Sequence, residues 1–292
     1  MFSTEPNFDR WKLTGFAGQN AYLLETVEST HSLMKQQAAT GKIQPGALVV
    51  ANQQTAGRGR HERTWASPAN ENLYFNILIP LEGIALSKAP QITQVAALTF
   101  AETFRNIQDE SGTAPQLGRV TVKWPNDILC GKSKFCGILA EIVFVPGETV
   151  DGKRQPPRPA VNMGVGINVN SDPANYAFLN RPVTTLKEIA GGRQINREKL
   201  LQALVGNLER AIGQFRAFGL SPWIEAWRKM DQFIGARGTI VVNNNCTDEN
   251  RDSGAGSIKK SGRILDMQPD GSLLFETDDG KIETVYSADL EI

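Results

Sequence analysis

The chain has 292 residues, of which 40% are hydrophobic and 21% charged, and this ordinary globular usage excludes a fibrous or wholly disordered protein. The 31 basic residues balance the 31 acidic ones, so no overall charge recruits nucleic acid or a membrane surface. The length is about twice that of a typical domain. We therefore expect a large domain over residues 1–234 and a small one over 235–292.

The N-terminus and the cysteines indicate the compartment. Residues 1–10 contain two acids and a proline rather than a basic start with an apolar run, so they do not resemble a signal peptide. The purest apolar stretch, residues 73–81, is interrupted by Asn76 and Pro80 and is too short to span a bilayer. Cys130, Cys136 and Cys246 form no CxxC pair, which favours free thiols and a cytoplasmic protein without membrane contact.

Periodicity and capping signals predict strands clustered in the middle of the first 234 residues, with helices before and after them. Helices are expected where apolar residues recur on one stripe behind a capping residue, and strands where Val, Ile and Phe cluster between turn residues. In chain order these are a helix at 29–40, strands at 47–51 and 72–79, a helix at 88–110, strands at 119–123, 138–145 and 160–169, and helices at 185–190, 196–218 and 222–230. Residues 146–159 are rich in proline and predict a long hairpin loop. The pattern indicates an α+β fold with a mainly antiparallel sheet and flanking helices.

The pattern changes after residue 234, where no helical periodicity remains. Short strands are expected at 239–242, 262–267, 272–276 and 282–286, separated by turn sequences such as Pro269-Asp270-Gly271. This spacing predicts a small C-terminal β-barrel, with the polar stretch 243–261 as a loop within it.

Gly57-Arg58-Gly59-Arg60 directly follows a predicted strand and is followed by Arg63 and Trp65. Glycines let a backbone approach a ligand closely, and arginine forks match phosphate or carboxylate oxygens. A solvated basic loop or a nucleic-acid-binding segment would explain the same residues. If the arginines serve an anion, we expect loop 55–66 to stay open until that anion arrives.

Three further clusters contain polar residues beside strands. Lys123-Trp124-Pro125-Asn126-Asp127 ends a strand, Lys134 precedes Gly137 in another, and Gly164-Val165-Gly166-Ile167-Asn168 closes a third. Individually the first two clusters are equally typical of a turn and of a solvated edge lysine. The third lacks the last glycine of a dinucleotide-binding loop, because Val169 occupies that place.

Together, the order and spacing of these clusters resemble those of biotin protein ligases. Glu28-Ser29-Thr30 is similar to the start of that family's biotin loop, and Gln54 stands where the family has a biotin-contacting glutamine. The resemblance runs from about Tyr22 to the C-terminus. It implies a catalytic domain resembling class II aminoacyl-tRNA synthetases, with a mixed, mainly antiparallel sheet, followed by an SH3-like β-barrel. It also implies synthesis of biotinyl-5′-AMP from biotin and ATP, and transfer of biotin to one lysine of a carrier domain.

The resemblance also implies roles for individual residues. Lys134 is expected on the biotin carboxylate and the adenylate phosphate, Arg58 and Arg60 on the phosphate side, and Lys123 as a further catalytic cation. Asp127 is expected to assist the acceptor amine. The remaining residues implied to bind biotin or its adenylate are Ser29, Thr30, His31, Gln54, Gly59, Trp65, Asn126, Gly137, Gly164, Gly166 and Asn168.

Two positions depart from the family pattern. His31 replaces the usual asparagine, and His61-Glu62 interrupts the basic run after the Gly-Arg repeat, where a solvated loop tip is the simpler interpretation. Mg²⁺ is expected on the ATP phosphates with mostly water and substrate ligands, so we predict no protein metal ligand.

The implied partner is the biotin carboxyl carrier protein of acetyl-CoA carboxylase. Residues 1–20 contain no helix-turn-helix pattern, so a monofunctional ligase without DNA binding is expected. The sequence leaves a monomer and a homodimer open. A lipoate or octanoate ligase, which shares the catalytic fold, and a nucleic-acid-binding module using the arginine loop are the alternative functions.

Overall fold

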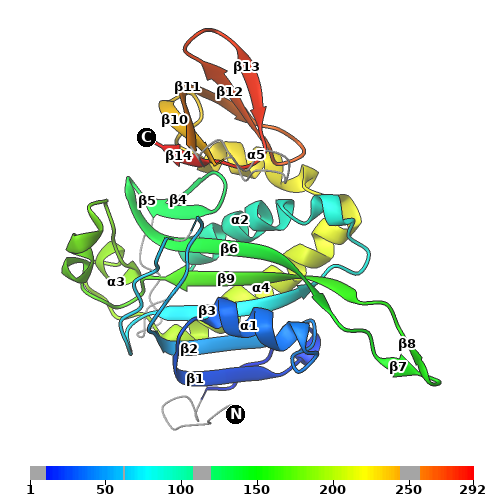
Figure 1. Cartoon of the computed structure of the whole chain (residues 1–292). Coiled ribbons are helices and arrows are strands. Elements are labelled where there is room, and N and C mark those ends of the chain that lie inside the picture. The colour runs from blue at the N-terminus through cyan, green and yellow to red at the C-terminus, as the bar shows by residue number, and fades with distance from the viewer. Residues whose placement is uncertain (1–10, 62, 108–119, 244–256) are drawn as a thin grey trace.

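The protein is described by a computed structural model that covers residues 11–61, 63–107, 120–243 and 257–292. Predictions for Cys246, Glu62 and residues 1–10, for the end of the helix expected at 88–110 and for most of the loop expected at 243–261 lie outside these residues. The centre of the protein is a seven-stranded sheet in the order β1-β2-β3-β9-β6-β5-β4 (Figure 1). Only β1 and β2 pair in parallel and the other pairs are antiparallel, so the α+β prediction with a mainly antiparallel sheet is confirmed.

The strands of this sheet are mostly those that the sequence predicts, with two additions, β1 and β5. Their bounds are β1 Ala21–Val27, β2 Leu48–Gln54, β3 Leu73–Pro80, β4 Val120–Lys123, β5 Asp127–Cys130, β6 Ser133–Val145 and β9 Arg158–Ile167. Between β6 and β9 a small hairpin of β7 Thr149–Val150 and β8 Lys153–Arg154 projects from the body, at the lower right of Figure 1.

Helices cover the two faces of the sheet unequally. On one face α2 and α4 pack over the strands, whereas α1 covers only part of the other face (Figure 1). Ser29 caps α1 by accepting a hydrogen bond from the Ser32 amide, and Asn196 caps α4 through the Lys199 amide, as the sequence predicts. The helices are α1 Thr30–Ala39, α2 Gln91–Arg105, α3 Leu186–Ile189, α4 Arg197–Phe218 and α5 Ser221–Met230, with 3₁₀ turns η1 Phe16–Gly18, η2 Leu86–Lys88 and η3 Pro173–Leu179.

The C-terminal strands form a second sheet in the order β13-β12-β11-β10-β14, at the top of Figure 1. The outer strands β13 and β14 do not pair with each other in the described residues, so the predicted barrel is here an open antiparallel sheet. It rests on the first part of the chain through the Trp124 indole, which donates to the carbonyl of Gly271 at 2.9 Å. The division into domains at residue 234 stays a prediction. The strands are β10 Arg237–Asn243, β11 Ser257–Met267, β12 Leu273–Thr277, β13 Ile282–Val285 and β14 Asp289–Glu291.

Candidate active site

A cavity lies on the sheet face that α1 covers only in part. Its floor has almost no side chains, because Gly137 of β6 stands opposite Gly166 of β9, and the next inward-facing residue of β9 is Gly164. Side chains alternate between sheet faces, so these three glycines share the face that carries α1. The strands thereby form a shallow cradle in which a flat ligand can approach the backbone.

Polar groups surround one end of the cavity, where α1 begins. Gln54 accepts hydrogen bonds at Oε1 from the amide and the hydroxyl of Thr30, at 2.9 and 3.0 Å, and its Nε2 donates to Ser67 at 3.0 Å. Gln54 therefore lines the cavity but uses both ends of its amide to tie α1 to the following loop. The lone pairs of the Thr30 hydroxyl and the hydroxyl hydrogen of Ser29 remain available to a ligand.

Trp65 lies over the glycine cradle. A Cβ added at Gly166 would stand 2.4 Å from the Trp65 ring, and one at Gly137 would stand 2.9 Å from it. The indole nitrogen of Trp65 is buried without a partner among the described residues. With Trp65 in this position the cavity volume is about 80 Å³, well below the roughly 300 Å³ of small ligand pockets.

Lys134 and Asp127 form an ion pair at the other end of the cavity. Lys134 Nζ donates to Asp127 Oδ1 at 2.6 Å and lies 5.3 Å from the centre of the Trp65 ring. Both side chains are less than a quarter exposed. One cation and one carboxylate thus stand beside the cradle, where they can meet an anionic ligand group and an incoming amine.

The arginine loop is a hairpin that closes over the cavity. Arg58 bridges to Thr64, and the amides of Gly59 and Trp65 donate to the carbonyls of Arg63 and Gly57. The open loop expected at 55–66 is therefore not observed.

The hairpin is closed because Asp289, from the C-terminal sheet, neutralises its arginines. Arg63 forms an ion pair with Asp289 at 2.6 Å, and the guanidinium of Arg60 lies 3.6 Å from the same carboxylate. Arg60 also donates to the side chain of Asn126 and to the carbonyl of Ala288. Burial lowers the pKa of Arg60, and the charge of Asp289 partly offsets that effect. His61 at the hairpin tip is 3.7 Å from Asp289 as well, so it is not simply a solvated residue.

All but two of the predicted site residues line this one cavity. They are Ser29, Thr30, His31, Gln54, Arg58, Gly59, Arg60, Trp65, Asn126, Asp127, Lys134, Gly137, Gly164 and Gly166. Asn168 instead lines a smaller cavity on the other side of Trp65, together with Lys134 and Arg181.

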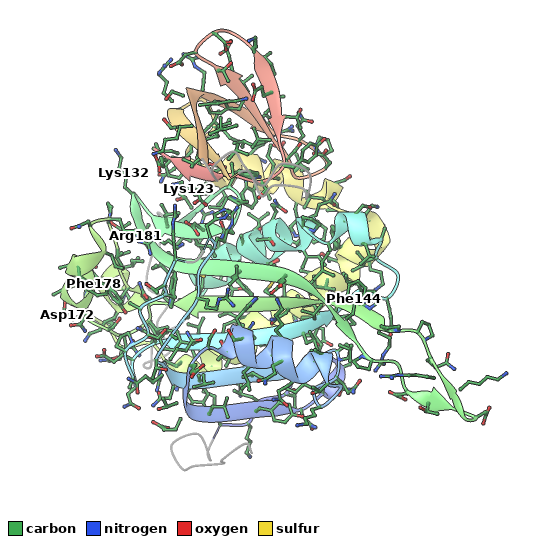
Figure 2. The ribbon with its side chains drawn as sticks, in the orientation of Figure 1. Lys123, Lys132, Phe144, Asp172, Phe178 and Arg181 are labelled. Carbon is green, nitrogen blue, oxygen red and sulfur yellow. The ribbon has the colours of Figure 1, made fainter. Side chains whose placement is uncertain are left out.

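Lys123 stands outside the cavity, next to Asp127 in the β4–β5 pair and 5.8 Å from the ring of Phe233. Burial lowers the pKa of Lys123, and the Asp127 carboxylate opposes that shift. Figure 2 shows Lys123 at the top of the central sheet, below the C-terminal strands, and Arg181 near the outer edge of the molecule.

The predicted site lacked five polar residues of the cavity wall, namely Arg63, Thr64, Asn76, Arg181 and Asp289. Asn76 had a signal, since it is the polar interruption of the apolar stretch 73–81. Asp289 had none, because it lies more than two hundred residues after Arg60 in the chain.

Two further features concern metal ions and membranes. Among the described residues, no three His, Cys, Asp or Glu side chains gather in a way that would hold a metal ion, and Asp127 and Asp289 are both paired with cations. The described helices include none that is long and apolar enough to cross a membrane.

The cavity has polar groups at one end and cations at the other, a distribution of charge that would suit a compact acid. Residues 23–152 match the model of the biotin/lipoate A/B protein ligase family. The chain is 30% identical to the bifunctional ligase/repressor BirA of Salmonella typhimurium over 89% of this chain and 70% of that protein. It is 32% identical to the biotin–[acetyl-CoA-carboxylase] ligase of Paracoccus denitrificans over 64% of this chain and 72% of that one.

The fold is also similar to that of a solved structure. The biotin protein ligase from Aquifex aeolicus in complex with biotin and ATP matches with a TM-score of 0.67 and 22% identity, over 93% of this chain and 97% of that one. The chain belongs to the biotin protein ligase family.

Proposed function

We propose that this protein is an ATP-dependent ligase that converts biotin to biotinyl-5′-AMP and transfers the biotinyl group to a lysine of a biotin carboxyl carrier protein of acetyl-CoA carboxylase. The single observation that carries the proposal is the convergence of Arg58, Arg60 and Lys134 on a glycine cradle beside Trp65. A compact bicyclic acid can lie on such a cradle once the Trp65 ring moves away from the glycines, and its carboxylate needs cations before it can approach a triphosphate.

In the first step, a carboxylate oxygen of biotin attacks the α-phosphorus of ATP and pyrophosphate leaves. Two anions meet in this step, so catalysis requires fixed positive charge where they join. We assign that role to Lys134, with Arg58 and Arg60 on the phosphate side. Mg²⁺ would arrive with the ATP phosphates as part of the substrate, and its charge would offset theirs.

In the second step, the acceptor amine attacks the carbonyl carbon of the mixed anhydride, an amide forms and AMP leaves. The amine must lose a proton, and we assign Asp127 as the group that accepts it. Because Asp127 is paired with Lys134 at 2.6 Å, it also holds Lys134 in place for the first step. Asn126 supports the same region by donating to the carbonyl of Ile138. Lys123 would act from outside the cavity, through its charge.

Incubation with biotin, ATP, Mg²⁺ and a purified carrier domain, followed by avidin blotting, tests the proposal. We expect a labelled carrier, and no label when ATP is omitted or the acceptor lysine is replaced by arginine. A parallel reaction with lipoate and a lipoyl carrier domain tests the related activity. Labelling of the lipoyl carrier alone would contradict the proposal. We further propose that the protein acts in the cytoplasm and does not bind DNA.

A further inference from the structure

We propose that Asn76 is a specificity-determining residue of the cavity, whose side-chain oxygen accepts a hydrogen bond from a ring N–H of the ligand, and that His31 positions it. The inference rests on the proposed function, which supplies a cyclic urea as the ligand's polar edge. Asn76 is fully buried and lines the cavity, yet its Oδ1 has no hydrogen-bond partner among the described residues. A buried unpaired carbonyl oxygen costs about 1–3 kcal/mol, so a donor from the ligand would relieve it.

The orientation of the Asn76 amide follows from a chain of hydrogen bonds that begins at the backbone. The carbonyl of His31 can only accept, and it receives the Nδ2 of Asn162 at 3.0 Å. The Oδ1 of Asn162 therefore faces Asn76 and accepts from its Nδ2 at 2.7 Å. The unpaired atom of Asn76 is consequently the oxygen, an acceptor.

His31 completes this arrangement through its ring. The second hydrogen of Asn76 Nδ2 points to His31 Nδ1 at 3.1 Å, so Nδ1 must be unprotonated. The ring hydrogen then lies on Nε2, which faces Glu141 Oε2 at 3.3 Å. Burial lowers the pKa of His31 despite the nearby Glu141 carboxylate, and the charges of Arg58 and Lys35 lower it further, so the neutral ring is favoured.

The cavity wall lacks a side chain at this place. Gly164 is directly opposite Asn76 in the sheet, and a Cβ there would stand 3.1 Å from both the Asn76 amide nitrogen and the His31 ring, and 3.2 Å from Asn76 Oδ1. The Asn76 amide is buried in the closed cavity, and the glycine lets a ligand reach it when the cavity opens. With the Thr30 hydroxyl oxygen as a second acceptor and the Ser29 hydroxyl as a donor, the wall offers two acceptors and one donor. A cyclic urea carries the complementary set of two N–H groups and one carbonyl.

The experiment compares biotin with its two ring-nitrogen monomethyl analogues, each of which lacks one N–H. Dissociation constants are measured by calorimetry for the full-length protein and for the Asn76→Ala and Asn76→Ser variants. We expect the wild type to bind one of the two analogues about ten-fold more weakly than biotin because of the lost hydrogen bond. Both variants should lose that preference while keeping any preference against the other analogue.

The outcomes separate the inference from the proposed function. A wild type that does not bind biotin contradicts the function itself. Biotin binding with unchanged discrimination in Asn76→Ala and Asn76→Ser overturns the inference and leaves the function intact. A folding defect would weaken all three ligands equally, and thermal unfolding of each variant identifies it.

The positioning role of His31 has its own readout in the pH profile. A proton on Nδ1 would face the Asn76 amide and turn its acceptor away, so wild-type affinity for biotin should be constant at pH 7–8. It should fall only at more acidic pH, because burial lowers the pKa of His31 from its ordinary value. In His31→Asn, which has no titrating ring, the affinity should be flat from pH 5 to 8. A fall of equal size in the variant would overturn this role.

Discussion

The two faces of the central sheet differ in what they are made of. The face under α2 and α4 carries large apolar side chains such as Phe75 and Met163, and Phe100 of α2 packs against Phe75; all three are fully buried. Near the N-terminus of α1 the opposite face has glycines and asparagines in the same strands, with Asn76 and Gly164 one residue away from Phe75 and Met163. One set of strands therefore supplies both the core and the cavity.

This difference separates stability from function along each strand. Alternate residues point to opposite faces, so a strand such as β3 can bury a phenylalanine on one side and present an asparagine on the other. The apolar face offsets the cost of leaving polar groups and an unfilled cradle on the other face. Substitutions on the two faces should accordingly affect different measurements.

The largest effect is expected from Phe100→Ala on the apolar face. The ring of Phe100 is fully buried and packs edge-on against Phe75, with 6.4 Å between ring centres. Its loss should lower the free energy of unfolding by about 3–5 kcal/mol, because a cavity replaces the ring. Urea titration measures the stability, and biotin affinity measured below the unfolding transition should stay within about twofold. A large loss of affinity in the folded variant would show that the two faces are not separable.

Lys134→Ala tests the face of the sheet that carries the cavity. Removing a fixed charge of this kind costs roughly 3–4 kcal/mol in the transition state, or about a hundred- to thousand-fold in rate. Biotin-dependent exchange of pyrophosphate into ATP measures the first step. Stability should fall by about 1–3 kcal/mol, less than in Phe100→Ala, because the mostly buried Asp127 carboxylate loses its charged partner.

Asp127→Asn is the matched variant for the second step. Transfer from preformed adenylate to the carrier should slow by about 10²–10⁴, while pyrophosphate exchange falls far less. Equal loss of exchange in both variants would mean that Asp127 serves only to hold Lys134. Retention of exchange by Lys134→Ala would contradict the role given to that lysine.

The sequence predicted the fold wherever local signals agree. Helices α1, α2 and α4 begin at capping residues or carry a clear apolar stripe, and Leu73–Pro80 is an apolar run whose polar interruption is Asn76. It missed β1, an edge strand without alternation, and β5, whose four residues follow a Pro-Asn turn. The sequence could not predict which strands pair, because the register between two distant strands is not encoded in the sequence of either strand alone.

For the site, too, local signals were readable and long-range contacts were not. The order of the motifs predicted that the glycines and the cations share one site, but it could not predict that Gly137 stands opposite Gly166. It also could not show that Gln54 is engaged by Thr30, or that the hairpin arginines meet Asp289 from the C-terminal sheet. Long-range contacts of this kind depend on the folded chain.

Asp289→Asn tests whether the second sheet completes the cavity. Loss of the carboxylate removes the ion pair with Arg63 at 2.6 Å and the negative charge, 3.6 Å from Arg60, that partly offsets the burial of the Arg60 guanidinium. We expect the hairpin to open, trypsin to cleave it faster at Arg63, and the KM for ATP to rise about ten-fold. Glu291→Gln is the control, because this exposed carboxylate in the same strand pairs with Lys259. Equal effects of the two variants would contradict a specific role for Asp289.

The smallest effect is expected from Lys35→Met, at the exposed edge of the polar face. Lys35 donates to Glu141 at 2.5 Å, and both side chains are well exposed, so the pair contributes less than about 1 kcal/mol to stability. Its charge nevertheless acts on His31, because Lys35 repels the protonated ring and competes for the Glu141 carboxylate. Removing it should raise the pKa of His31. Neutral His31 supports ligand binding, so biotin binds with full affinity at pH values above the pKa of His31. In Lys35→Met the affinity should therefore begin to fall at a higher pH than in the wild type.

The chain has two histidines, so a proton NMR titration in the His61→Asn background follows His31 alone. Lys42→Met, which removes another exposed lysine near α1, is the control and should leave the titration in place. An unchanged His31 titration in Lys35→Met would show that Lys35 is electrostatically isolated from the cavity.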